Sequence, residues 1–267
     1  EEIMIWDPLP EPVPVAELLE GLSGIDADFV RGAFRLAEGL YDRLPPRKNG
    51  QPAFTHPTNV ARILKAAQAQ PHVIAAGLLH DVLEDRVDEE PAASGHRAHS
   101  LEQSIRGSFA SDVIALSEQA LFPREIAERV VEVAWVLTRH KADLYYKSIS
   151  SVFNHTDTVV RIAGALVKLA DRMHNIQTIE NYGDEEKLYQ CFKNLFILNN
   201  AKQLLVEVRA RNWDPRMVTT LQKLFKKCGK ATFQALLRMS HGAHDTPRGF
   251  QMLTYLALAL RKFTHEM

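Results

Sequence analysis

Four acidic or imidazole side chains crowd the segment LLHDVLED, residues 78–85. His80 and Asp81 are adjacent, and Glu84 and Asp85 follow one helical turn later on the same two edges of a helix. Leucine and valine fill the other positions. Ionised carboxylates are costly to bury unless they are paired or bind a metal. The segment therefore either faces water or lies against a cation.

Two distant stretches offer further donors to such a cation. His56 lies in AFTHP, and Asp171 interrupts the apolar face of LVKLADRMHN. Two imidazoles and two carboxylates form a mixed nitrogen and oxygen set that suits a divalent metal. An exposed His-Asp pair without a metal is the simpler alternative, but the combination of the three stretches favours the metal. The four predicted ligands are His56, His80, Asp81 and Asp171.

Helices are predicted to position these residues, and the predicted fold class is all-α. Apolar residues recur at helical spacing, and no β-branched run with a period of two indicates a strand. The first fifteen residues hold four prolines and are expected to be an extended arm. Residues 88–100 are expected to form a surface loop, with Ser100 and Gln103 as a capping box that opens the next helix. The other predicted helices span 26–44, 72–85, 111–121, 123–139, 143–153, 157–181, 184–210, 214–228, 230–239 and 246–265, with one more beginning at Pro57.

The composition argues against several classes of partner. The 267 residues include 32 basic and 33 acidic side chains, so no net charge attracts nucleic acid or an anionic membrane. No run approaches the ~18 apolar residues of a membrane span, and the first residues lack a signal-peptide pattern. We therefore expect a cytoplasmic protein that binds neither nucleic acid nor membranes. The apolar stripe YLALALRKF, residues 255–263, is either core or the surface of a homo-oligomer.

The stretches RKNGQPAFTHPTNVARIL, AAGLLHDVLED and LVKLADRMHNIQT resemble the HD-domain phosphohydrolases. More specifically, they resemble the hydrolase domain of RelA/SpoT-type proteins, including the small stand-alone alarmone hydrolases. This resemblance implies an HD-domain helical bundle over residues 26–183. An N-terminal arm and first helix would occupy residues 1–25. Additional C-terminal helices, residues 184–267, would pack on the same core.

The resemblance also implies an activity, the removal of the 3′-pyrophosphate from (p)ppGpp, a guanosine polyphosphate. The four predicted ligands would hold one divalent ion of the Mn²⁺ kind. Glu84 and Asp85 would serve the water and proton handling. The residues that would contact the guanine or the phosphates are Arg47, Lys48, Asn49, Asn175 and Thr178.

Two alternatives to this activity stay open. The stretch between Asp85 and Asp171 is longer than is usual in the family, which allows another nucleotide or phosphoester substrate, as in a 5′-nucleotidase or an NADPH phosphatase. A binding module with a decayed site is the other, and the presence of all four ligands argues against it. Only 84 residues (267 − 183) follow residue 183, too few for a synthetase domain, so hydrolysis without synthesis is expected. Arg139, predicted to end a helix, suits either the helix dipole or phosphate binding.

Overall fold

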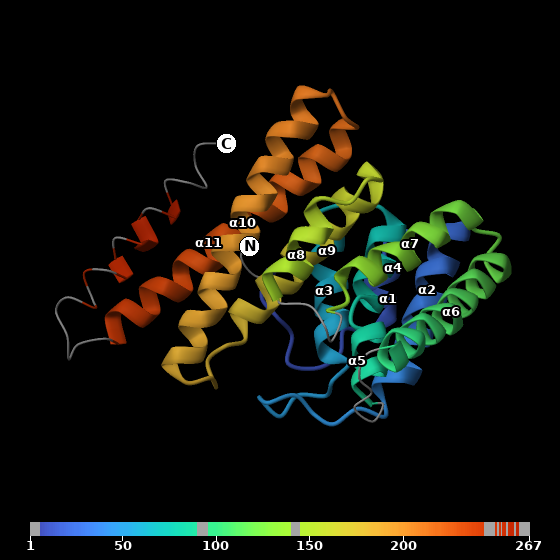
Figure 1. Cartoon of the computed structure of the whole chain (residues 1–267), viewed down its shortest axis with the longest axis horizontal. Coiled ribbons are helices and arrows are strands. Elements are labelled where there is room, and N and C mark those ends of the chain that lie inside the picture. The colour runs from blue at the N-terminus through green and yellow to red at the C-terminus, as the bar shows by residue number, and fades with distance from the viewer. Residues whose placement is uncertain are drawn as a thin grey trace. The chain divides into compact units, whose positions relative to one another are not determined.

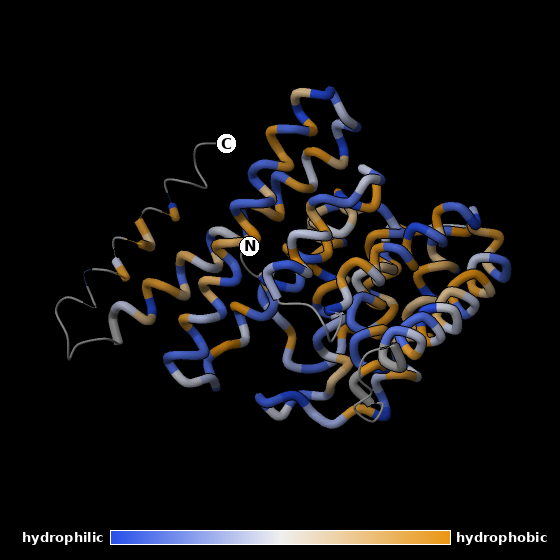
Figure 2. Tube along the Cα trace, viewed as in Figure 1, coloured by the Kyte–Doolittle hydropathy of each residue, from blue (hydrophilic) through white to orange (hydrophobic). Residues whose placement is uncertain are grey.

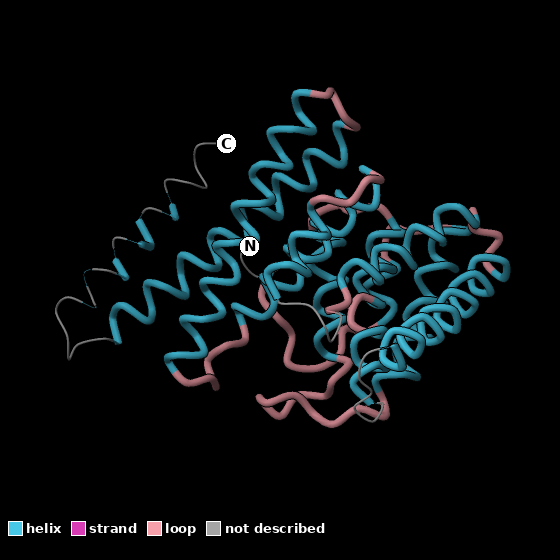
Figure 3. The backbone as a smooth tube through the Cα atoms, in the orientation of Figure 1, coloured by secondary structure: helices cyan, strands magenta, loops and turns pink. Residues whose placement is uncertain are grey.

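The computed structural model describes residues 6–89, 96–139 and 145–242, and several positions between 249 and 261. Throughout this part of the chain the regular elements are helices and there is no strand (Figure 3). The predicted all-α class is therefore confirmed. None of the described helices is both long enough and apolar enough to cross a membrane.

The chain divides into two compact units, one formed by Leu9–Val167 and the other by Glu1–Pro8 with Lys168–Met267. The boundary falls inside α9 (Thr158–Gln177), and the predicted domain limits at residues 26 and 184 stay predictions. The second unit also holds α10 (Asp184–Ala210) and α11 (Pro215–Gly242) (Figure 1). The helices of the first unit before α9 are α1 (Val15–Leu19), α2 (Gly24–Tyr41), α3 (Thr55–Ala66), α4 (Pro71–Leu79), α5 (Val82–Glu89), α6 (His96–Gln119), α7 (Arg124–Leu137) and α8 (Tyr145–Phe153).

Helix α4 is the central element of the first unit, and it packs against α2, α3 and α7. Every residue from His72 to Leu79 is buried, as expected for a helix that is apolar all round. In contrast, hydrophobic and hydrophilic residues alternate along α10 and α11, as the orange and blue segments of Figure 2 show. Such helices bury one face only. His80 directly follows α4, so the first predicted ligand pair lies at the end of the most buried helix.

The predicted helix over residues 72–85 is wrong, because α4 ends at Leu79 and α5 begins at Val82. The carbonyl oxygen of Gly77 lies 2.8 Å from Nδ1 of His80 and accepts its proton. The imidazole of His80 thus competes for the Gly77 carbonyl with the backbone N–H four residues later, which would bond to it in a continuous helix. No proline or glycine marks the break in the sequence.

Two other predicted boundaries are also wrong. Helix α6 begins at His96, so Ser100 lies inside it and the capping box does not form. Residues 96–100, which were predicted as part of the surface loop, are therefore helical. The helix predicted at 111–121 is the second half of α6. Helix α11 runs without interruption through Gly229. One glycine costs only about 1 kcal/mol in a helix, and the buried neighbours Cys228 and Thr232 offset that cost. Thr246, predicted as the cap of the last helix, lies outside the described residues.

Gly77 allows α3 and α4 to approach each other closely. A Cβ atom at this position would overlap Cδ1 of Leu64 and lie 3.5 Å from Cγ1 of Val60. Leu64 is fully buried and has little room to move. Close approach at this point matters for function because the next turn of the chain presents His80.

We expect Gly77→Ala to lower the free energy of unfolding. Overpacking a core costs roughly 1–3 kcal/mol, whereas glycine to alanine in a helix gains only about 0.5–1 kcal/mol. Denaturant unfolding measures the balance. Gly39→Ala in α2 is the matched control, because its new Cβ would meet no atom within 4 Å, and it should stabilise the protein. Equal stabilisation of both variants would contradict this account.

His72 is a buried histidine, 8% exposed, near the start of α4. Burial, with a smaller contribution from the charge of Arg129, lowers its pKa to about 4. An unfolded histidine has a pKa of about 6.5, so between pH 4 and 6.5 the unfolded chain binds more protons than the folded one. The folded state therefore loses stability as the pH falls through this window.

His72→Gln is expected to reduce this acid sensitivity. The wild type should lose up to about 3 kcal/mol more than the variant between pH 7 and pH 4. Chemical unfolding at a series of pH values measures the difference. The control His99→Gln removes an exposed histidine and should follow the wild type. An unchanged acid slope in His72→Gln would show that His72 does not carry the effect.

Candidate metal centre

Three of the four predicted ligands lie together in the first unit. Nε2 of His80 is 3.1 Å from Oδ2 of Asp81, and Nε2 of His56 is 3.5 Å from the same oxygen. One donor atom from each residue lies within 4.8 Å of the other two, and no other such group occurs among the described residues. Two imidazole nitrogens and a carboxylate are suitable donors for a divalent metal.

The hydrogen bond of His80 fixes which of its nitrogens can bind a metal. A carbonyl oxygen can only accept, so Nδ1 must carry the proton that bonds to Gly77. The lone pair then lies on Nε2, the atom that faces Asp81. Metal-binding histidines usually hold their other nitrogen in this way. His80 is therefore oriented as a ligand, and the donor set fits the metal that the sequence predicts.

The N-terminal arm positions His56 by holding α3. The backbone N–H of Leu9 donates to Oδ1 of Asn59 at 2.8 Å, and the amide of Asn59 donates back to the Leu9 carbonyl at 3.1 Å. The N–H of Val13 donates to Oγ1 of Thr58 at 3.0 Å. His56 lies in the first turn of α3, is only 5% exposed, and has its ring centre 5.2 Å from that of His80.

A hollow of about 430 Å³ opens beside these ligands. The side chain of Asp81 remains 36% exposed there, whereas those of His56 and His80 are buried. Loss of solvation alone would raise the pKa of Asp81, but the imidazoles of His80 and His56 outweigh it and hold this pKa below its usual range. The carboxylate is therefore ionised and ready for a cation. The residues that line the hollow are Tyr41, Leu44, Pro45, Arg47, Ala53, His56, Asp81 and Asp85.

Asp85 is the second carboxylate of the hollow. Desolvation and the charges of Asp81 and Glu84 raise its pKa to about 7, against an opposing effect of His80. Tyr41 lines the same hollow and was not predicted. Burial and the charges of the two aspartates raise the pKa of Tyr41 well above its usual value. Its position just before Pro45 and Arg47 in the sequence was the available clue.

The predicted phosphate-binding stretch forms a tight turn. The N–H of Arg47 donates to the carbonyl of Gln51, and the N–H of Gly50 donates to that of Arg47, both at 2.8 Å. Gly50 has a φ of 81°, which favours glycine. Asn49 bonds within the turn, since its side chain donates to Oε1 of Gln51 at 2.8 Å. Arg47 reaches the hollow, and Lys48 is exposed.

Glu84 contacts a residue far away in the sequence. Its Oε2 accepts the backbone N–H of Arg139 at 3.2 Å, and its Oε1 lies 3.6 Å from Nη2 of the same residue. Arg139 follows α7 and the terminal residue Thr138. Glu84 thus joins the start of α5 to the end of α7, while Asp85 lines the hollow.

The remaining predicted residues belong to the second unit. Asp171 is only 4% exposed, and its Oδ2 pairs with Nζ of Lys168 at 2.8 Å. Its Oδ1 accepts a hydrogen bond from the amide of Asn175. The hydroxyl of Thr178 donates to the carbonyl of His174 at 3.0 Å. Lys168, a partly buried residue three positions before Asp171 on α9, was not singled out from the sequence.

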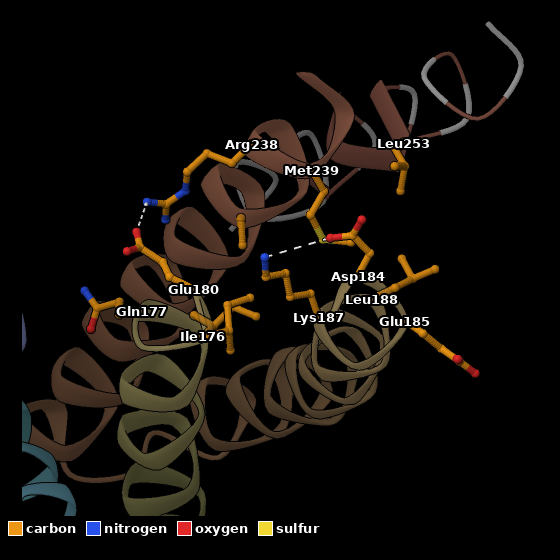
Figure 4. Close-up of a pocket in the computed structure, with 12 residues that line it drawn as sticks. Ile176, Gln177, Glu180, Asp184, Glu185, Lys187, Leu188, Arg238, Met239 and Leu253 are labelled. Carbon is orange, nitrogen blue, oxygen red and sulfur yellow. Dashed lines mark ion pairs between the residues drawn. The ribbon is translucent and has the colours of Figure 1, made fainter. Parts of the chain in front are cut away.

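A separate hollow of about 560 Å³ lies within the second unit, between the end of α9, the start of α10 and α11 (Figure 4). Its wall includes Ile176 and Met239. Two loose ion pairs border it, Arg238 with Glu180 and Lys187 with Asp184, each at 3.8 Å. Among its described lining residues there is no histidine or cysteine, so they do not offer the mixed donors of the first hollow.

Comparison with known proteins agrees with this arrangement. A family model described as "HD domain" matches residues 33–197. The matched span covers more than half of the chain and contains all four predicted ligands.

Curated relatives match the chain at lower coverage. A Synechocystis protein named "Probable guanosine-3′,5′-bis(diphosphate) 3′-pyrophosphohydrolase" is 28% identical over 148 residues, 53% of this chain and 15% of that protein. A Myxococcus xanthus protein named "GTP pyrophosphokinase" is 26% identical over 162 residues, which are 61% of this chain and 18% of that protein. A Haemophilus influenzae protein named "Guanosine-3′,5′-bis(diphosphate) 3′-pyrophosphohydrolase" is 26% identical over 133 residues, which are 50% of this chain and 16% of that protein. The matches thus span less than a fifth of these relatives.

Proposed function

Because this chain belongs to the HD domain family, we propose that it is a metal-dependent phosphohydrolase that acts on guanosine polyphosphates. The observation that carries the proposal is the His56–His80–Asp81 trio beside a hollow that also holds Asp85 and Arg47. Groups that could bind a metal, exchange a proton and contact a phosphate thus lie at one hollow. The names of the relatives support the choice of substrate.

We propose Mn²⁺ as the ion, with Asp171 as its fourth protein ligand. When bound, such an ion lowers the pKa of a coordinated water and polarises a phosphoryl oxygen. His56, His80 and Asp81 would hold it through the donor atoms that already face one another. Asp171 would first have to exchange its contacts with Lys168 and Asn175.

Asp85 is the carboxylate proposed for proton transfer. A group with a pKa near the working pH both accepts and returns a proton readily. Its pKa of about 7 is in that range. Water attack then releases pyrophosphate from the 3′ position, so ppGpp yields GDP and pppGpp yields GTP. One water is consumed for each pyrophosphate released.

Arg47 is proposed to bind the substrate. Its planar guanidinium can contact phosphate with two N–H groups or stack on a base. Lys48, Asn49, Asn175 and Thr178 are also proposed to contact the substrate. Asn49, Asn175 and Thr178 would have to exchange hydrogen bonds that they make within their own segments. The cytoplasmic location and the lack of nucleic-acid binding stay predictions.

The test is to incubate the purified chain with Mn²⁺ and ppGpp and to identify the products. GDP and pyrophosphate in equal amounts are expected. The same chain supplied with GTP and ATP should make no ppGpp. A panel with 5′-nucleotides and NADPH tests the substrate class. Release of phosphate from one of these, with ppGpp untouched, would exclude the proposed substrate and keep the hydrolase class.

A further inference from the structure

Arg139 is held at two points by one carboxylate. Glu84 accepts the backbone N–H of Arg139 through Oε2 and faces its guanidinium through Oε1. The two residues are 55 positions apart in the sequence. This double contact fixes the backbone of Arg139 as well as its side chain, immediately after α7 ends.

The contact lies next to the proposed catalytic carboxylate. Glu84 directly precedes Asp85, which lines the hollow, and follows Asp81 by three residues in the chain. The side chain of Arg139 is nevertheless 54% exposed, while that of Glu84 is 29% exposed. An ion pair this open adds little stability by itself. The guanidinium has five N–H donors, more than one carboxylate oxygen can use.

The charge of the site indicates what the exposed guanidinium could bind. Two carboxylates, Asp81 and Asp85, line the hollow, and among its described lining residues only Arg47 carries a permanent positive charge. A nucleotide with two diphosphate groups brings several more negative charges. Such a substrate requires cationic side chains in addition to a divalent metal. Arg139 lies against the carboxylate next to Asp85 and can supply one.

We propose that Arg139 binds a phosphate group of the substrate and that Glu84 is its positioning residue. This inference rests on the proposed function and adds to it a second substrate-binding arginine. Glu84 then acts on the reaction through Arg139, and the proton transfer belongs to Asp85. Oε2 of Glu84 holds the backbone of Arg139, and Oε1 faces its guanidinium.

The first test is Arg139→Ala in the Mn²⁺-loaded full chain. A hydrogen bond to a charged group is worth about 1.5–3 kcal/mol, which corresponds to roughly 10–100-fold in binding. KM for ppGpp should rise by about that factor, and inhibition by inorganic pyrophosphate should weaken similarly. Metal content should not change. Arg129→Ala is the matched control. Arg129 is another exposed arginine, and its Nε faces Oδ2 of Asp157 at 3.7 Å. It lies ten residues before Arg139, which corresponds to about 15 Å at the helical rise.

The second test separates positioning from proton transfer. Glu84→Gln retains an acceptor for the Arg139 N–H but loses the charge that faces the guanidinium. KM should rise, and kcat should still rise with pH as in the wild type, but with its midpoint at a lower pH, because the charge of Glu84 contributes to the raised pKa of Asp85. Arg139→Ala combined with Glu84→Gln should be no worse than Arg139→Ala alone. An unchanged KM in Arg139→Ala, or a further fall of kcat in the double variant, would overturn the inference. A wild type that leaves ppGpp intact would instead overturn the proposed function.

Discussion

Asp81→Ala is expected to lose bound metal and hydrolytic activity together. Oδ2 of Asp81 is the atom that both histidines approach, at 3.1 and 3.5 Å, so its removal leaves the two imidazoles without an anionic donor beside them. The loss of activity should exceed the ~10–100-fold that loss of a residue merely supporting a ligand costs. Metal analysis after dialysis, with ppGpp turnover on the same sample, measures both quantities.

His80→Ala should behave in the same way, and a control is available. His155→Ala removes a histidine that faces a carboxylate, Glu132 at 3.5 Å, outside the trio. This control should retain metal and turnover. Thermal unfolding of the metal-free proteins separates loss of the site from loss of the fold. If both ligand variants kept one metal per chain, the site would have to lie elsewhere.

Asp85→Asn is expected to keep the metal and lose turnover. The amide preserves the shape of the side chain in the hollow but cannot accept a proton from water. Turnover should fall by roughly the 10²–10⁴-fold typical of losing a general acid or base. Single-turnover measurements at saturating ppGpp test this, with Asp28→Asn, an exposed aspartate of α2 paired with Arg31, as the control.

The pH profile gives this prediction a second readout. Asp85 has a pKa of about 7. A bound cation favours the ionised form of a carboxyl group, so the pKa of Asp85 in the Mn²⁺-loaded enzyme should be at or below that value. Wild-type kcat should therefore rise with pH and level off by about neutrality. Asp85→Asn should lack this rise. Full turnover in the variant with an unchanged profile would remove Asp85 from the mechanism.

The sequence alone was sufficient for the class of the fold and for the meeting of three of the four predicted ligands. Helical periodicity predicted an all-α chain, and the predicted helix over 184–210 coincides with α10. His56, His80 and Asp81 were predicted to meet and do so. These features depend on local patterns, namely the repeat of apolar residues along a helix and the rare placement of ionisable groups within it.

Only the tertiary structure decided how the site is assembled. The break between α4 and α5 depends on a side chain of His80 that competes for a backbone carbonyl, and no residue type announces it. Tyr41 enters the hollow, and Glu84 meets Arg139 across 55 residues, because helices distant in the sequence pack together. Periodicity states which face of a helix is buried but not which partner buries it. That choice belongs to the packing of the whole unit, and it determines which carboxylate faces the hollow and which one holds an arginine.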